Sequence, residues 1–81
     1  MKPQYEPTHD TQAVAYLCEE CGEVLAAAGK SLRWGLDSVN PELDNPETNR
    51  EWLLRELVDL EGAIKRVRAF VGTAKETHAN T

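Results

Sequence analysis

The sequence predicts an all-α protein, an antiparallel helical hairpin that assembles by oligomerisation into a four-helix bundle. Apolar residues recur every three to four positions in two long segments, which is the period of an amphipathic helix. No segment shows the alternation of a strand, and no repeat is present. With 81 residues, 41% of them hydrophobic, the chain forms one small domain whose own core is marginal, so a homodimer or homotetramer is expected.

The first helix is expected to follow a flexible leader, residues 1–9. Thr8 or Asp10 is the candidate N-cap, because a side-chain oxygen there can accept a hydrogen bond from the first turn. The helix is predicted to run to Trp34. Gly35 follows as the residue that ends it, since glycine tolerates the backbone of a helix C-terminus.

The second helix is predicted to open at Asn45, the start of the second of two Asn-Pro-Glu units. Asparagine is a good cap, proline suits the first helical position and glutamate favours the first turn. A short turn is expected between the helices at residues 41–44. The helix is predicted to stop at Gly72, which gives a helical domain of residues 10–72 and a flexible polar tail of residues 73–81.

Each helix carries an aliphatic stripe that has the spacing of an ordinary packing face, and the stripe of the second helix has the alternating four-and-three spacing of a bundle seam. On an ideal wheel of about 100° per residue, the stripes comprise Val14, Leu17, Cys21, Val24, Leu25, Ala28 and Leu32, and Leu53, Leu57, Leu60, Ile64, Val67 and Val71. Leu54 and Val58 lie away from these stripes and are a candidate surface for a partner chain.

A second face beside each stripe carries acids. It comprises Ala13, Tyr16, Glu20, Glu23, Ala27 and Trp34 on the first helix, and Trp52, Glu56, Asp59, Ala63, Arg66 and Phe70 on the second. In an antiparallel hairpin that joins the two predicted helix ends, residues at equal height have numbers that sum to about 79. Glu20 is therefore expected level with Asp59. Glu23 is likewise expected level with Glu56.

Four carboxylates at one height would repel one another strongly in a partly dry groove unless a cation lies among them. Several oxygen ligands suit a hard divalent cation, Mg²⁺ or Mn²⁺. Glutamates three apart on a helix usually form a solvated face, and this interpretation stays open for each pair alone. The coincidence of two pairs at one height, among small and aromatic neighbours, favours a metal site with Glu20, Glu23, Glu56 and Asp59 as ligands.

The segments EECGE (residues 19–23) and RELVD (residues 55–59) resemble the ExxE and ExxD motifs of the MazG-like all-α nucleoside triphosphate pyrophosphohydrolases. The likeness extends over roughly residues 13 to 71. It implies that the four acids hold Mg²⁺, and that a nucleoside triphosphate, in particular a deoxynucleotide, is cleaved to a monophosphate and pyrophosphate. Family members often have further helices that this chain lacks, so a second chain is expected to complete the pocket.

Five further residues are candidates for roles around this site. Glu19, one position before the ligand pair, is a candidate general base, with a plain surface acid as the alternative. Arg66 and, further from the site, Lys30 are candidates to meet a phosphate, and ordinary solvated cations are the alternative. Trp52 and Asn49 are candidates to stack on the base and to hydrogen-bond its edge, with structural roles as their alternatives.

Composition limits the other function classes. The net charge of -5, from nine Lys and Arg against fourteen Asp and Glu, argues against nucleic acid as a partner. The chain shows neither a signal-like start nor an apolar run of membrane-spanning length, so we expect a cytoplasmic protein with no membrane partner. Cys18 and Cys21 have CxxC spacing without a second pair, which favours two buried thiols over a zinc or redox site.

Two other functions remain as alternatives. A non-catalytic helical dimerisation module would carry the acids as a solvated stripe. A carboxylate-bridged redox metal protein would typically use Glu-x-x-His motifs, and neither His9 nor His78 lies in a helix near the acids.

Overall fold

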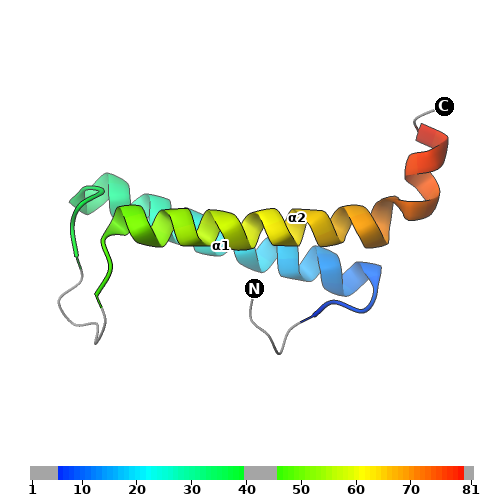
Figure 1. Ribbon diagram of the computed structural model, residues 1–81, viewed down its shortest axis with the longest axis horizontal. Coiled ribbons are helices and arrows are strands. Elements are labelled where there is room, and N and C mark those ends of the chain that lie inside the picture. The colour runs from blue at the N-terminus through cyan, green and yellow to red at the C-terminus, as the bar shows by residue number, and fades with distance from the viewer. Residues whose placement is uncertain (1–5, 40–45, 80–81) are drawn as a thin grey trace.

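The computed structural model describes residues 6–39 and 46–79. Its two helices, α1 (Asp10–Trp34) and α2 (Asn49–Ala79), lie side by side as an antiparallel hairpin (Figure 1). Within the described residues there is no strand, only one isolated antiparallel bridge between Val39 and Thr48. The predicted all-α hairpin is confirmed, while the turn predicted at residues 41–44 lies outside the described residues.

The N-terminus of α1 is capped by His9, not by either of the residues that the sequence predicted. The imidazole Nδ1 of His9 accepts a hydrogen bond from the backbone N–H of Gln12 at 3.3 Å. The side chain of Gln12 reaches back and accepts from the backbone N–H of Thr8 at 2.9 Å. A neutral imidazole nitrogen accepts a hydrogen bond as a cap oxygen does, so histidine can take this position.

Both ends of α2 differ from the prediction. The helix begins at Asn49 because Thr48 and Glu51 form a capping box: Thr48 Oγ1 accepts from the backbone N–H of Glu51 at 3.1 Å, and Glu51 Oε1 accepts from that of Thr48 at 2.8 Å. The helix continues past Gly72 to Ala79. Glycine inside a helix costs only about 1 kcal/mol relative to alanine, and Gly72 does not adopt the positive φ of a C-cap.

The predicted end of α1 at Gly35 is confirmed, and hydrogen bonds tie this end to the start of α2. Gly35 has a φ of 101° and its N–H donates to the carbonyl of Ser31 at 2.9 Å. The side-chain amide of Asn49 donates to the carbonyl of Gly35 at 2.9 Å. Arg50 donates its backbone N–H to the carbonyl of Leu36 at 2.7 Å. These contacts hold the two helix ends at one level and so set the register of the hairpin.

The helices meet through the acid-bearing face, and the aliphatic stripes lie beside this contact. The buried residues of this contact are Ala13, Tyr16, Glu20 and Ala27 from α1, and Glu56 and Ala63 from α2. Alanine at these positions lets two helices approach closely, because the interaxial distance depends on the side chains at the contact. A layer of two helices covers only one face of each, so the stripes are only partly covered. Their half-buried members are Leu17, Val24, Ala28, Leu53, Leu60 and Val67, and their exposed aliphatic members are Val14, Leu25, Leu32, Leu57, Ile64 and Val71.

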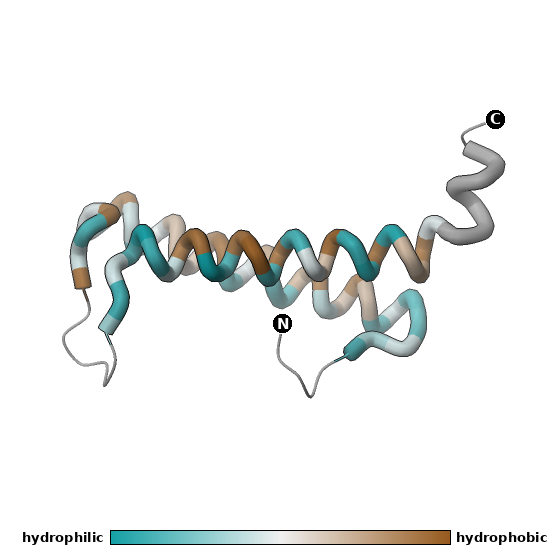
Figure 2. Tube along the Cα trace, in the orientation of Figure 1, coloured by the Kyte–Doolittle hydropathy of each residue, from teal (hydrophilic) through white to brown (hydrophobic). Residues whose placement is uncertain are grey.

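Both aliphatic stripes lie on the same broad side of the hairpin. They are centred about a quarter-turn from the contact face in the same rotational sense, and in an antiparallel pair this brings them to one side. Leu25 is 71% exposed and Leu32 is 89% exposed. Figure 2 shows hydrophobic residues recurring along both helices. The chain measures 14 Å along its shortest axis, so the described residues form a single layer.

Among the residues that the structure describes, neither helix has a stretch that is long and apolar enough to cross a membrane.

The first prediction concerns Gly35. Its φ of 101° and ψ of 151° form a backbone conformation that residues with a Cβ atom rarely adopt. We expect Gly35→Ala to lower the free energy of unfolding by about 1–3 kcal/mol, measured by chemical denaturation. Gly29→Ala is the matched control, because Gly29 lies within α1 and an added Cβ there meets no atom within 4 Å. This control should be neutral or stabilising by up to about 1 kcal/mol. Equal effects of both changes would contradict the role given to Gly35.

Candidate metal centre

The four predicted acids come together between the helices. Glu20 of α1 lies with Glu56 and Asp59 of α2, with one carboxylate oxygen of each within 4.8 Å of the others. Glu19, Glu20 and Glu23 form a second group of this kind on α1. Glu20 belongs to both groups and so joins the acids of the two helices into one cluster. The predicted facing of Glu20 and Asp59 is therefore confirmed.

Two of these acids are almost fully buried. Glu20 is 2% exposed and Glu56 is 6% exposed. Glu23 and Asp59 are half-buried, and Glu19 is exposed. A carboxylate loses strong hydration when it is buried, and this loss must be offset by hydrogen bonds or by a cation. Glu20 and Glu56 are therefore not part of a solvated face.

Glu20 has the most perturbed environment of the cluster. Its pKa is raised from 4.5 to about 7, first by burial and then by its hydrogen bond to Glu23 and the negative charges of Glu23, Asp59 and Glu56. Its Oε2 atom is buried and has no hydrogen-bond partner in the described part of the chain. Buried polar atoms normally have such a partner, so this oxygen is suited to a ligand that the protein alone does not supply.

Tyr16 lies one turn before Glu20 and is 1% exposed. Burial raises the pKa of its hydroxyl to about 12, and the negative charges of Glu20 and Asp59 act in the same direction. The sequence placed Tyr16 on the acid-bearing face but did not predict it as a site residue. The signal in the sequence is that Tyr16 lies four residues before Glu20, on the same helix face as Glu20 and Glu23.

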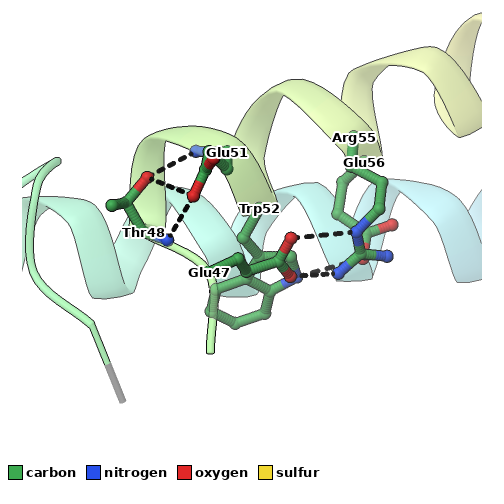
Figure 3. Close-up of polar contacts among 6 residues, drawn as sticks. All are labelled: Glu47, Thr48, Glu51, Trp52, Arg55 and Glu56. Atoms are coloured by element: carbon green, nitrogen blue, oxygen red, sulfur yellow. Dashed lines mark hydrogen bonds and ion pairs between the residues drawn. The ribbon is translucent and has the colours of Figure 1, made fainter. Parts of the chain in front are cut away.

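Glu56 is held by two donors from its own helix (Figure 3). Trp52 Nε1 donates to Glu56 Oε2 at 3.0 Å. Arg55 Nη1 lies 3.5 Å from the same oxygen, and Arg55 Nη2 donates to Glu47 Oε1 at 2.6 Å. Sequence analysis missed Arg55 and Glu47. The only sequence signal for Arg55 is its position directly before Glu56. No spacing relation predicts that Glu47 lies against α2.

Arg66, predicted to meet a phosphate, is engaged by the segment before α1. Its Nε donates to Glu6 Oε1 at 2.9 Å and its Nη1 donates to the carbonyl of Gly62 at 2.9 Å. Its positive charge reaches Tyr16, whose hydroxyl pKa it lowers against the larger opposing effects. Arg66 is therefore near the acid cluster, and its guanidinium forms an ion pair with Glu6.

The remaining candidates lie at the turn end of the hairpin. Asn49 donates its side-chain amide to the carbonyls of Gly35 and of Lys30, at 2.9 and 3.3 Å. Asn49 therefore has a structural role, which was the alternative to base recognition. Contact of Asn49 with a base stays a prediction. Lys30 is exposed, and its contact with a phosphate also stays a prediction.

The expectation of buried thiols is wrong, because Cys18 and Cys21 are both free and exposed. Cys21 belongs to the aliphatic stripe of α1 and Cys18 lies beside it, where the hairpin contact does not cover either thiol.

The cluster fits a hard divalent cation. Its donors are all carboxylate oxygens from Glu20, Glu23, Glu56 and Asp59, which is the ligand set that Mg²⁺ and Mn²⁺ prefer. The buried Oε2 of Glu20 without a hydrogen-bond partner supports this fit independently of the number of acids.

The second prediction concerns the pH dependence of the metal-free protein. Because the folded state raises the pKa of Glu20 from 4.5 to about 7, it binds the Glu20 proton more tightly than the unfolded state does. Stability from this group is therefore present below about pH 4.5 and is lost as pH rises to about 7. We expect the melting temperature in a metal chelator to fall over this interval. Glu20→Gln should flatten the fall.

Glu61→Gln is the control for this experiment, because Glu61 is an exposed glutamate of α2 outside the cluster. This variant should keep the pH dependence of the parent protein. A melting temperature that rises between pH 4.5 and 7, in the parent and in Glu20→Gln alike, would contradict the raised pKa.

Comparisons of the chain with protein-family models, with curated proteins and with solved structures found no match. The likeness to MazG-like enzymes therefore rests on the two acidic motifs and their spacing.

Proposed function

We propose that the protein is a metal-dependent nucleoside triphosphate pyrophosphohydrolase. It cleaves a nucleoside triphosphate, in particular a deoxynucleotide, between the α and β phosphates and releases a monophosphate and pyrophosphate. The observation that carries the proposal is the cluster of Glu20, Glu56 and Asp59 between the helices, with two of its three carboxylates almost fully buried. The likeness of EECGE and RELVD to the ExxE and ExxD motifs supports the same reaction.

In this proposal Glu20, Glu23, Glu56 and Asp59 hold Mg²⁺, or Mn²⁺ in its place. The bound ion supplies charge stabilisation on the phosphate oxygens and a lowered pKa for a coordinated water. Glu19 is exposed at the edge of the cluster, where it can accept a proton from the attacking water. Glu19 forms a group with Glu20 and Glu23, so this candidate base lies beside the proposed metal ligands. Unlike Glu20, it is exposed.

The substrate phosphates meet Arg66 in this proposal. A guanidinium presents paired donors that suit a phosphate, and Glu6 now occupies two of those donors. The exchange of a carboxylate for a phosphate keeps the charge at Arg66 compensated. Lys30 and Asn49 lie towards the turn. Lys30 is exposed there, whereas Asn49 can reach a nucleoside only with its side-chain oxygen, because its amide nitrogen donates to the carbonyls of Gly35 and Lys30.

The third prediction tests the reaction with Asp59→Asn. This change keeps the shape of the side chain but removes a negative ligand, so we expect loss of at least about 10-fold in metal affinity or turnover. The assay incubates the protein with Mg²⁺ or Mn²⁺ and a panel of nucleoside triphosphates, and it separates pyrophosphate from orthophosphate. Helix content by circular dichroism should stay unchanged, because Asp59 is half-buried and is not a packing residue.

Asp37→Asn is the matched control, since the Asp37 side chain is 81% exposed in the segment after α1. Full turnover is expected for this variant. Release of orthophosphate would indicate a phosphatase. Full activity of Asp59→Asn, or no hydrolysis of any common or modified nucleoside triphosphate, would contradict the proposed function.

The assembly is proposed to be a homodimer or homotetramer that forms a four-helix bundle. The aliphatic side of the hairpin supports this, because Leu25, Leu32 and Ile64 are exposed there in a layer only 14 Å thick. A second hairpin packed on this side would give each helix a covered aliphatic stripe and a bundle core. Leu54 and Val58, 58% and 65% exposed, lie on the outer edge of α2 and offer a second contact for a tetramer.

The fourth prediction separates these two surfaces. Ile64→Glu places a charge in the aliphatic side, so we expect sedimentation velocity to show dissociation to monomers and loss of stability. Leu54→Glu places the same charge on the outer edge and should leave at least a dimer. A parent protein that sediments as a folded monomer at micromolar concentration would contradict the assembly.

A non-catalytic helical dimerisation module is the alternative function, and the uncovered aliphatic side is the observation that favours it. Divalent metal discriminates the two. Millimolar Mg²⁺ or Mn²⁺ should raise the melting temperature of the hydrolase, because the ion binds only the folded cluster. A dimerisation module in which these acids have no function should show the same melting temperature with and without the metal.

A further inference from the structure

We propose that Trp52 is a positioning residue whose indole N–H holds the carboxylate of Glu56 in the orientation in which it ligates the metal ion. This inference rests on the proposed function, because it assigns a role within the same acid cluster. It differs from the role as a base platform that the sequence suggested for this tryptophan.

The contact is well formed and local. Trp52 Nε1 donates to Glu56 Oε2 at 3.0 Å, and the two residues are one helical turn apart on α2. Figure 3 shows the two side chains directed toward each other. Trp52 is half-buried and Glu56 is 6% exposed, so the hydrogen bond is partly shielded from solvent. A tryptophan side chain in a helix has few rotamers, so its N–H has a fixed direction.

A second donor reaches the same oxygen. Arg55 Nη1 lies 3.5 Å from Glu56 Oε2, and the Arg55 guanidinium is itself held by Glu47 at 2.6 Å. Two donors on one oxygen restrict rotation of the carboxylate group about its last bond. Of the two contacts, that of Trp52 is the shorter and the less exposed, because the Arg55 side chain is 54% exposed.

The neutral charge of the indole matters for this role. The Arg55 guanidinium, 3.5 Å from Glu56 Oε2, carries a positive charge that competes with a metal ion for this carboxylate. The indole N–H is a donor without a charge, so it orients Glu56 and leaves its negative charge for the ion. Outer-shell donors of this kind fix ligand orientation, and their loss typically weakens metal affinity by about 10–100-fold.

Trp52→Phe separates positioning from stacking, since phenylalanine keeps an aromatic ring and lacks the N–H. We expect Mn²⁺ affinity, measured by calorimetry, to fall about 10-fold or more. A base-stacking role alone would leave Mn²⁺ affinity unchanged and would raise KM for the nucleotide when tryptophan is replaced by leucine. Trp34→Phe is the matched control, because Trp34 is 59% exposed beside Arg33, and it should leave Mn²⁺ affinity unchanged.

A measurement on the unsubstituted protein guards against misfolding of Trp52→Phe. The two indole N–H resonances are followed by ¹⁵N–¹H correlation spectra during a Mg²⁺ titration. The resonance that is missing from the spectrum of Trp34→Phe belongs to Trp34, and the other belongs to Trp52. We expect the Trp52 resonance to shift as Mg²⁺ binds and the Trp34 resonance to stay in place. A Trp52 resonance that does not move at saturating Mg²⁺ would overturn the proposal.

The outcomes distinguish this inference from the proposed function. Unchanged Mn²⁺ affinity in folded Trp52→Phe overturns the positioning role and leaves the metal site intact. Mn²⁺ binding without hydrolysis of any nucleoside triphosphate overturns the hydrolase, while the affinity of Trp52→Phe still decides the positioning role. A parent protein that binds no Mn²⁺ overturns both.

Discussion

The placement of Glu20 and Glu56 in the contact between two helices is the constraint on which the rest of the structure depends. Two carboxylates, 2% and 6% exposed, occupy a position that a small helical protein would ordinarily fill with aliphatic side chains. The alanines beside them, Ala13, Ala27 and Ala63, bring the helices close while adding little apolar area. The contact therefore contributes less hydrophobic stabilisation than its length suggests, because burial free energy follows apolar area.

With acids at the centre of the hairpin contact, the aliphatic stripes are only partly covered. Leu32 at 89% exposure and Leu25 at 71% are on the side that the hairpin does not cover. Function and assembly are thus linked through the rotation of each helix about its axis. Rotation of both helices by about a quarter-turn would bury the leucines within one chain, but it would also expose Glu20 and remove the reason for a partner.

Periodicity, the height relation and glycine chemistry predicted much of this structure, namely two helices, their antiparallel order, the end of α1 at Gly35 and the meeting of Glu20 with Asp59. Periodicity did not determine which of two neighbouring faces forms the contact, because both faces have helical spacing and lie about a quarter-turn apart. The cap at Thr48 was missed because an Asn-Pro-Glu unit offered an equally good local signal. The hydrogen bond from Trp52 to Glu56 depends on rotamers, which spacing alone does not specify.

The cluster is asymmetric, and this asymmetry connects metal binding to proton release. Glu56 Oε2 has Trp52 and Arg55 as donors, whereas Glu20 Oε2 is buried without a hydrogen-bond partner among the described residues. Glu56 Oε2 is therefore oriented by hydrogen bonds before any ion binds, and Glu20 Oε2 is not. Because the Glu20 pKa is raised to about 7, a proton occupies this group in a large share of the metal-free molecules at neutral pH. A cation that ligates Glu20 must displace that proton, so its apparent affinity should increase with pH across the range in which Glu20 titrates.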